Sequence, residues 1–285
     1  MNFGETLKRI RKNRQMTQLQ VCEGIMPQGT YSRIERGKLP LTLAQTVQFA
    51  QRLNVSLNEL MYIHQNYTAT SREKVLKAFR EIELVGVADL STKWADVKRV
   101  SAADPHLQLL DEAYALFDVL FKTEDIAQVQ QVAVPIWEKL SRLDHWYLED
   151  LELLNAMLYY FPVDVAEQIV QTALKRLHQY EAYEKDITAL SFYFRLNLAN
   201  LYIGHQLYEK GKAQLQEVFT LKQKMSYQTL SFAYTLQIIA HVHLSLPYDK
   251  MYQQLIGLLT AYEDATLKEQ LLAEIHAHQH VTEEV

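Results

Sequence analysis

The chain has 285 residues, of which 48% are hydrophobic and 22% charged, a balance typical of a globular protein with a sizeable core. Its 8 Gly and 6 Pro residues exclude collagen-like and low-complexity chains, and its single cysteine excludes a disulfide framework or a CxxC metal site. The charge is uneven, because residues 1–66 carry nine Lys or Arg against four Asp or Glu, whereas the rest carries 20 against 30. This asymmetry indicates that the basic first part meets a polyanion and that the acidic remainder does not.

The sequence has no segment typical of export or of membrane insertion. Residues 1–20 lack the apolar core of a signal peptide, and no stretch approaches the ~18 uncharged apolar residues of a membrane span. We therefore expect a cytoplasmic protein without a membrane partner, in which the lone thiol of Cys22 stays reduced.

Residues 1–66 are predicted to form five short helices, because most of them begin with the spacing of a capping box. In such a box the side chain of the first residue accepts a hydrogen bond from the backbone N–H three positions later. The side chain of that later residue in turn accepts from the backbone N–H of the first. The apolar residues between these start signals keep helical spacing, as Phe3, Leu7 and Ile10 do. The four predicted boxes are Asn2 with Glu5, Thr17 with Gln20, Thr42 with Gln45, and Ser56 with Glu59.

The second and third of these helices form a distinctive pair. The segment TQLQVCEG ends at Gly24, a tight connection follows at residues 25–27, and QGTYSRIERG stops at Gly37. Two short helices joined in this way form a helix-turn-helix, which presents its second helix to the major groove of DNA. The stretch TQLQVCEGIMPQGTYSRIERGK closely resembles the Cro/repressor (XRE-type) helix-turn-helix, of the lambda repressor-like fold.

The resemblance assigns DNA contacts to Gln18, which opens the first helix of the pair, and to residues on the outward side of the second. Arg33 suits a bidentate contact to guanine and Gln28 one to adenine, whereas Thr30 and Ser32 suit phosphate positioning. Gly29 stands where the family has a side chain, so the bases that are read stay open.

A structural ion pair is also implied by the resemblance. Arg11 and Glu35 match a family pair that ties the first helix to the third. The plain alternative for Arg11 is a solvent-exposed surface arginine, but its planar guanidinium is suited to a bidentate carboxylate contact, which favours the pair.

Residues 67–285 show long amphipathic segments with short polar breaks, and no alternating pattern of period two rises above them. This part is therefore predicted to be all-α. The predicted helices span 71–86, 91–102, 107–121, 124–140, 146–160, 163–180, 186–204, 208–222, 228–245, 248–260 and 265–277.

These helices come in pairs that indicate a degenerate repeat. The segment FRLNLANLYIGHQLYEKGKAQLQEV resembles one tetratricopeptide repeat, with Ala199 allowing close approach of two helices and Tyr202 filling the gap beside it. Other pairs match only in outline. Stacked helix pairs form an α-solenoid with an extended concave face, a surface that binds peptides or protein segments.

The two parts together resemble the peptide-sensing regulators of Gram-positive bacteria, the Rgg, PlcR, PrgX and NprR group, and most of all its Rgg/MutR branch. The resemblance rests on GTYSRIERGK, NVSLNELMYIHQNY and LLNAMLYYFPVDVAEQIVQTALKRLHQYEAY. It implies a homodimeric quorum-sensing transcription factor, in which residues 1–66 bind an operator. Residues 67–285 would dimerise and hold a short hydrophobic signalling peptide in the concave face.

Candidate peptide-binding residues follow from that resemblance. Asparagine both donates and accepts hydrogen bonds, as an extended peptide backbone requires, and Arg195 suits an acidic side chain or a terminal carboxylate. The alternatives are that the asparagines cap or bridge helices, that Arg195 faces solvent, and that Gln237 belongs to the core. The candidates are Asn155, Arg195, Asn197, Asn200 and Gln237.

Two other functions stay open on the sequence alone. One is a helical-repeat scaffold for a partner protein, and the other is a dimeric repressor that needs no ligand. No phosphate-binding loop, GxSxG or HExxH motif is present, so neither an enzyme nor a cofactor or metal is predicted.

Overall fold

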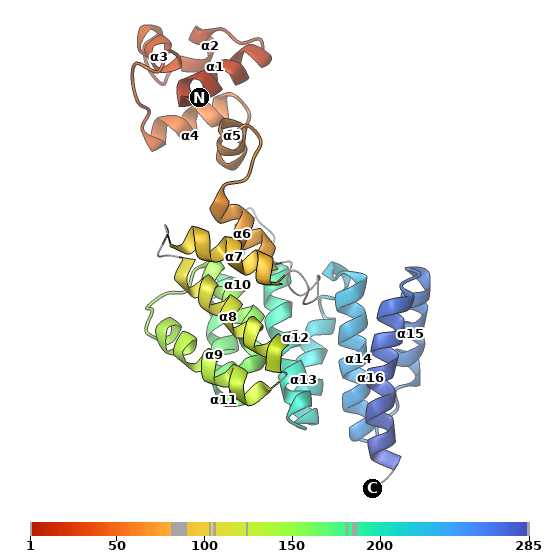
Figure 1. Cartoon of the computed structure of the whole chain (residues 1–285). Helices are drawn as coiled ribbons and strands as arrows, with labels where there is room; N and C mark the ends of the chain where they lie inside the picture. The colour runs from red at the N-terminus through yellow and green to blue at the C-terminus, as the bar shows by residue number, and fades with distance from the viewer. Residues whose placement is uncertain are drawn as a thin grey trace. The chain divides into compact units, whose positions relative to one another are not determined.

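A computed structural model of the chain describes residues 2–80, 90–102, 104, 107–123, 125–180, 182–183 and 187–283. The described residues form helices and no strand, which confirms the predicted all-α fold (Figure 1). The chain divides into two compact units, Met1–Glu83 and Leu84–Val285. None of the described helices is long and apolar enough to cross a lipid bilayer.

The first unit contains six helices in its described residues. The predicted helix that starts at residue 71 begins there, and its predicted end at 81–86 lies outside the described residues, as do the predicted first residues 124 and 186 of two later helices. The six are α1 (Phe3–Asn13), α2 (Gln18–Cys22), α3 (Gln28–Glu35), α4 (Leu43–Arg52), α5 (Leu57–His64) and α6 (Ser71–Arg80).

The capping signals of the sequence start these helices largely as predicted. The boxes at Asn2, Thr17 and Thr42 are complete, with both the forward and the return hydrogen bond. Ser56 accepts from the backbone N–H of Glu59 at 3.0 Å, but Glu59 returns no bond to any residue that the structure describes. The fourth box is therefore only half formed.

The core of the first unit collects one side of each of its first five helices. Leu7, Val21, Tyr31, Phe49 and Leu60 are all fully buried in one cluster. Cys22 belongs to the same cluster, and burial raises the pKa of its thiol, which disfavours the reactive thiolate.

Helix α1 packs directly on the backbone of α3. A Cβ atom at Gly4 would lie 1.8 Å from the carbonyl oxygen of Ile34, so only glycine permits this approach. This close approach fixes the position of α3 against α1.

The second unit is a succession of helices that pair as hairpins. Two short 3-10 turns, Leu158–Tyr160 and Lys222–Lys224, occur within it. The helices are α7 (Leu90–Ser101), α8 (Gln108–Thr123), α9 (Ile126–Ser141), α10 (Leu148–Met157), α11 (Val163–His178), α12 (Thr188–Gly204), α13 (Tyr208–Phe219), α14 (Tyr227–His243), α15 (Asp249–Ala261) and α16 (Ala265–Glu283).

Side-chain contacts fix the relative directions of α12, α13 and α14. Helix α13 is antiparallel to α14, because Phe219 packs on Tyr234 and Tyr208 stacks on His243. Helix α12 is likewise antiparallel to α13, since the buried Gly211 lies against Ile203 while Arg195 reaches Gln214 further along. Helices α12 and α14 therefore run in the same direction, as the first helices of successive repeats do.

Candidate functional site

Helix α3 is anchored by one face and open on the other. Tyr31, Ile34 and Glu35 are buried, and the Tyr31 ring packs on Phe49 with centroids 4.9 Å apart. Burial and the nearby carboxylate of Glu35 raise the pKa of Tyr31. The remaining side chains of this helix are left on the outward side.

Glu35 is the centre of a buried polar network. Arg11 holds it with two parallel bonds, from Nε to Oε1 at 2.6 Å and from Nη2 to Oε2 at 2.9 Å. The Nε2 of Gln18 donates to the same Oε2 at 2.8 Å. Burial acts to raise the pKa of Glu35, but the hydrogen bonds and charge of Arg11 and the bond from Gln18 outweigh it and hold this pKa below its ordinary value.

This network joins three helices, because Arg11 lies on α1, Gln18 on α2 and Glu35 on α3. Arg11 was predicted to pair with Glu35, whereas Gln18 was predicted only to contact DNA. The bond from Gln18 to Glu35 orients the Gln18 amide, and its oxygen remains available to a ligand.

Several arginines of the first unit serve its own structure. Arg9 donates to the carbonyl of Ile63, and Arg14 donates to that of Asn54. Arg52 donates to the carbonyls of Gln20 and Glu23, at the end of α2. These arginines close loops and helix ends, and they keep their positive charge because a backbone carbonyl is neutral.

Exposed cations without a partner among the described residues lie on and just after α3, and also on α1. Arg33 and Lys38 are exposed and form no hydrogen bond or ion pair with any described residue. Arg36 is exposed as well and folds back on the Ser32 carbonyl at 3.1 Å. Lys8 and Lys12 on α1 are likewise exposed and make no hydrogen bond or ion pair with a described residue, so the free positive charge of the first unit lies on α1 as well as at α3.

The other predicted contact residues of α3 lie beside Arg33. Gln28 is exposed, whereas Thr30 and Ser32 are half-buried. Gly29 faces open space, since a Cβ atom built there would meet nothing within 4 Å. An exposed, cationic helix without internal obstruction can enter the major groove of a duplex.

In the second unit the structure brings together two of the predicted peptide contacts. The Nδ2 of Asn197 on α12 donates to Asn155 on α10, to its backbone oxygen at 3.0 Å and to its side-chain oxygen at 3.2 Å. Both asparagines are half-buried, so this bond bridges the first helices of two successive pairs.

Asn200 on α12 and Gln237 on α14 lie at a similar height along these two parallel helices. The hydroxyl of Tyr193 lies 3.5 Å from that of Thr229, and Asn200 and Gln237 follow these residues by seven and eight positions along parallel helices. Asn200 is half-buried and makes no hydrogen bond within the described part of the chain. Gln237 is only 6% exposed, its Nε2 lies 3.0 Å from His241 and its Oε1 has no partner.

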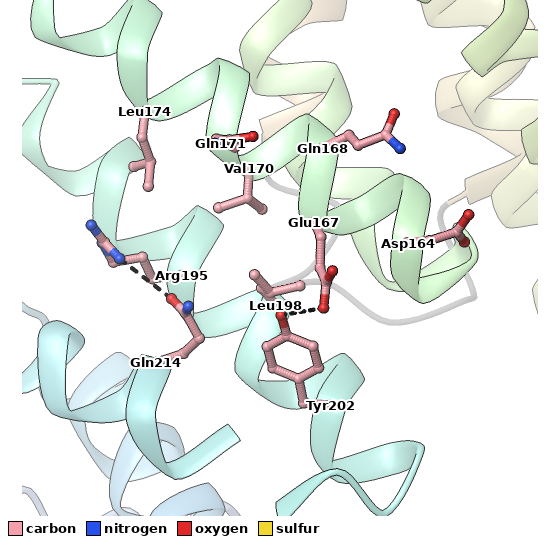
Figure 2. A pocket seen from close by; sticks show the side chains of 10 residues that line it. All are labelled: Asp164, Glu167, Gln168, Val170, Gln171, Leu174, Arg195, Leu198, Tyr202 and Gln214. Atoms are coloured by element: carbon pink, nitrogen blue, oxygen red, sulfur yellow. Dashed lines mark hydrogen bonds between the residues drawn. The ribbon is translucent and has the colours of Figure 1, made fainter. Parts of the chain in front are cut away.

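Arg195 does not belong with these amides. It is two residues from Asn197, which places the two side chains about 200° apart around α12. Arg195 instead lines a cavity of about 500 Å³ between α11, α12 and α13 (Figure 2).

A carboxylate that was not predicted from the sequence, that of Glu167, lies in the wall of this cavity. Glu167 Oε1 accepts from the Tyr202 hydroxyl and from Lys210 Nζ, each at 2.8 Å. These two bonds, with Lys210 the stronger cause, hold the pKa of Glu167 below its ordinary value. Nothing local signals this cluster, because its members come from three helices.

Comparisons with known proteins agree with this architecture. Residues 7–60 match the family described as "Helix-turn-helix". Among solved structures, a candidate transcriptional regulator of Listeria monocytogenes EGD-e is similar with a TM-score of 0.76 and 18% identity, over 99% of this chain and 98% of that one. No curated protein sequence matches the chain.

Two further similar structures are complexes. Bacillus thuringiensis PlcR, solved with the peptide PapR7 and DNA, has a TM-score of 0.67 and 18% identity over 95% of this chain and 98% of that one. ComR from S. thermophilus, solved with DNA and its signalling peptide ComS, has a TM-score of 0.60 and 17% identity over 97% and 99%. The predicted resemblance to peptide-sensing regulators is thus confirmed for the fold of both units.

Proposed function

We propose that this chain is a cytoplasmic, homodimeric, sequence-specific transcriptional regulator, and not an enzyme, whose DNA binding is switched by a short hydrophobic signalling peptide. Residues 1–66 would bind the operator, and residues 67–285 would hold the peptide and dimerise. The observation that carries the proposal is the exposed helix α3, whose Arg33 is free while its buried face is locked by Glu35. The likeness of the whole chain to the PlcR and ComR complexes supports it.

The proposed DNA contacts are divided by their chemistry. Arg33 and Gln28 would read base edges, whereas Thr30, Ser32 and the oriented amide of Gln18 would position the helix on phosphates or bases. In a homodimer, two such helices about 34 Å apart would meet successive turns of one face of a palindromic operator.

The test begins with selection of operator sites from a random duplex library by the full-length protein. We expect Arg33→Ala to weaken binding to the selected site about tenfold or more, because a bidentate base contact is lost. Arg142→Ala removes an exposed arginine of the second unit and serves as the matched control, with unchanged affinity. Equal affinities of the Arg33 variant and the wild type would refute the assignment of α3.

Salt dependence separates this proposal from a protein scaffold. Binding through several phosphates releases counterions, so the affinity for the selected duplex falls steeply between 50 and 200 mM salt. A scaffold that used the first unit as a protein contact would yield no enriched duplex at all.

The peptide switch would act on the amide-bearing face of α10, α12 and α14. Asn155, Asn197, Asn200 and Gln237 supply donors and acceptors there for an extended peptide backbone. Peptides selected from a displayed library of short hydrophobic sequences should change the affinity for the operator, and Asn200→Ala should weaken that response while leaving peptide-free DNA binding intact. A dimeric repressor without a ligand would select no peptide.

A further inference from the structure

Helix α12 has two opposite functional faces. At 100° per residue, Tyr193, Asn197 and Asn200 lie on one side of the helix, while Arg195, Leu198 and Tyr202 lie on the other. The first side meets α10 and α14 through Asn197 and Tyr193. The second side forms the floor of the 500 Å³ cavity between α11 and α13, so this cavity is separate from the amide-bearing face.

The cavity carries a free positive group at one end. Arg195 is half-buried, and its described contact is one long bond from Nη1 to Gln214 Oε1 at 3.4 Å. Because a guanidinium has five N–H donors, most donors of this cavity-lining side chain have no partner among the described residues. A carboxylate is the group that matches this fork with two parallel bonds.

A free negative group lies at the other end. Asp164 and Arg195 stand at opposite ends of the lining residues in Figure 2. Glu167 lies between them but is satisfied by Tyr202 and Lys210, whereas the exposed Asp164 has no partner among the described residues. The cavity therefore offers one unpaired anion and one unpaired cation, which complements a ligand with an ammonium and a carboxylate.

The walls between these ends suit a peptide backbone. Gln168 and Gln171 on α11 and Gln214 on α13 line the cavity, and each amide both donates and accepts. Between them, Val170 and Leu198 are each 3% exposed and give an apolar floor. Alternating polar and apolar groups of this kind fix the orientation of a ligand and exclude water.

The length of the cavity sets the length of the ligand. Asp164 and Leu174, which lies at the Arg195 end, are ten residues apart on α11, a rise of about 15 Å. An extended chain spans about 3.3–3.6 Å per residue, so about four residues fill this distance. We propose that the cavity binds a short free peptide of about four residues, with its carboxylate on Arg195 and its ammonium on Asp164.

This site goes beyond the proposed function, because it lies on the face of α12 opposite to the amides proposed for the signalling peptide. It requires neither an operator nor a change in DNA affinity. Its success or failure is therefore independent of the regulator proposal.

The test is calorimetric titration of the full-length protein with a synthetic library of free tetrapeptides composed of alanine, leucine, valine and phenylalanine. The same library is also prepared with amidated carboxyl ends and with acetylated amino ends. We expect the wild type to bind the free library. Its affinity for either blocked library should be at least about tenfold lower, because a charge-assisted contact is lost.

Two variants test which residue binds each end of the peptide. Arg195→Gln should bind free and amidated peptides equally, and Asp164→Asn should bind free and acetylated peptides equally. Arg142→Gln makes the same exchange at an exposed arginine outside both proposed peptide sites, so it is the matched control and should behave as the wild type. Thermal unfolding of each variant establishes that the second unit is folded.

Three outcomes would overturn the proposal. The first is the absence of binding by the free library at millimolar concentration. The second is equal binding of free and blocked libraries by the wild type. The third is an unchanged preference for free over blocked peptides in both Arg195→Gln and Asp164→Asn, which would place the bound peptide outside this cavity.

Discussion

The two units of this chain are held together by different kinds of contact. The first unit relies on charge-assisted bonds between distant segments, such as those of Arg9, Arg11 and Arg52 to carbonyls and to Glu35. The second relies on a large apolar cluster in which Ile238, Ile239 and Leu255 are fully buried. A small unit buries too little apolar surface to depend on packing alone, so it uses directed polar contacts as well.

This difference explains why the two units are unequally visible in the sequence. A directed contact such as Arg11 with Glu35 requires particular residues, whereas an apolar core tolerates exchanges of similar volume. Accordingly, the helix-turn-helix family matches residues 7–60, while the structural likeness to the Listeria protein extends over 99% of the chain at 18% identity.

The largest effect that we predict comes from the backbone contact of the first unit. Gly4→Ala should destabilise this unit by at least about 3 kcal/mol, because its Cβ would overlap the Ile34 carbonyl and no side chain can move to relieve it. Gly29→Ala is the control, since open space surrounds it and alanine favours the helix by about 0.5–1 kcal/mol. Hydrogen exchange across residues 3–64 of the full chain measures both, and equal protection in the two variants would contradict this packing.

The next effect concerns the buried ion pair. Glu35→Gln should cost about 3 kcal/mol in the first unit, because the guanidinium of Arg11, whose side chain is 11% exposed, loses its counter-charge. Glu23→Gln, at an exposed position, should change nothing measurable.

The same pair gives the first unit a defined pH dependence. Because folding lowers the pKa of Glu35, its contribution is complete above the unfolded pKa of about 4.3 and is lost as the pH falls through the folded value. Denaturant unfolding of the wild type between pH 6 and pH 3 should show this loss, and Glu35→Gln should not. A loss of the same size in the variant would assign it to other carboxylates.

A glycine of the second unit should give a smaller effect than Gly4. A Cβ at Gly211 would lie 2.9 Å from Cγ1 of Ile203, a side chain that can shift, so Gly211→Ala should destabilise the second unit by about 1 kcal/mol. Gly257→Ala, with open space around it, should stabilise the same unit slightly. A cost for Gly211→Ala as large as that for Gly4→Ala would contradict the contrast between the units.

The smallest effect is expected at the histidine pair of α14 and α16. His243 Nε2 lies 2.9 Å from His278 Nδ1, and burial together with the charge of His278 lowers the pKa of His243. Since the unfolded chain binds this proton more readily, stability falls as the pH drops below about 6.5, by less than about 1 kcal/mol. Thermal unfolding at pH 8 and pH 5.5 measures it, and His243→Gln should reduce the difference.

Much of the fold and part of the site followed from local patterns. The helix starts at Asn2, Thr17 and Thr42 were correct because a capping box involves residues only three apart. The same rule applies to Thr70 and Glu73 before α6, where the box was overlooked. The outward position of Arg33 was implied by the resemblance to the XRE-type helix-turn-helix, and Arg33 is exposed in the structure.

The sequence by itself determined the helices, the helix-turn-helix and the side of α3 that is free, since these depend on contacts within one or two turns. Only the tertiary structure decided that Gln18 binds Glu35, that Asn197 bridges to Asn155, and that Arg195 faces a cavity on the opposite side of α12. These contacts join residues that are 17 to 42 positions apart. They depend on how whole helices pack, and no pattern of neighbouring residues encodes that packing.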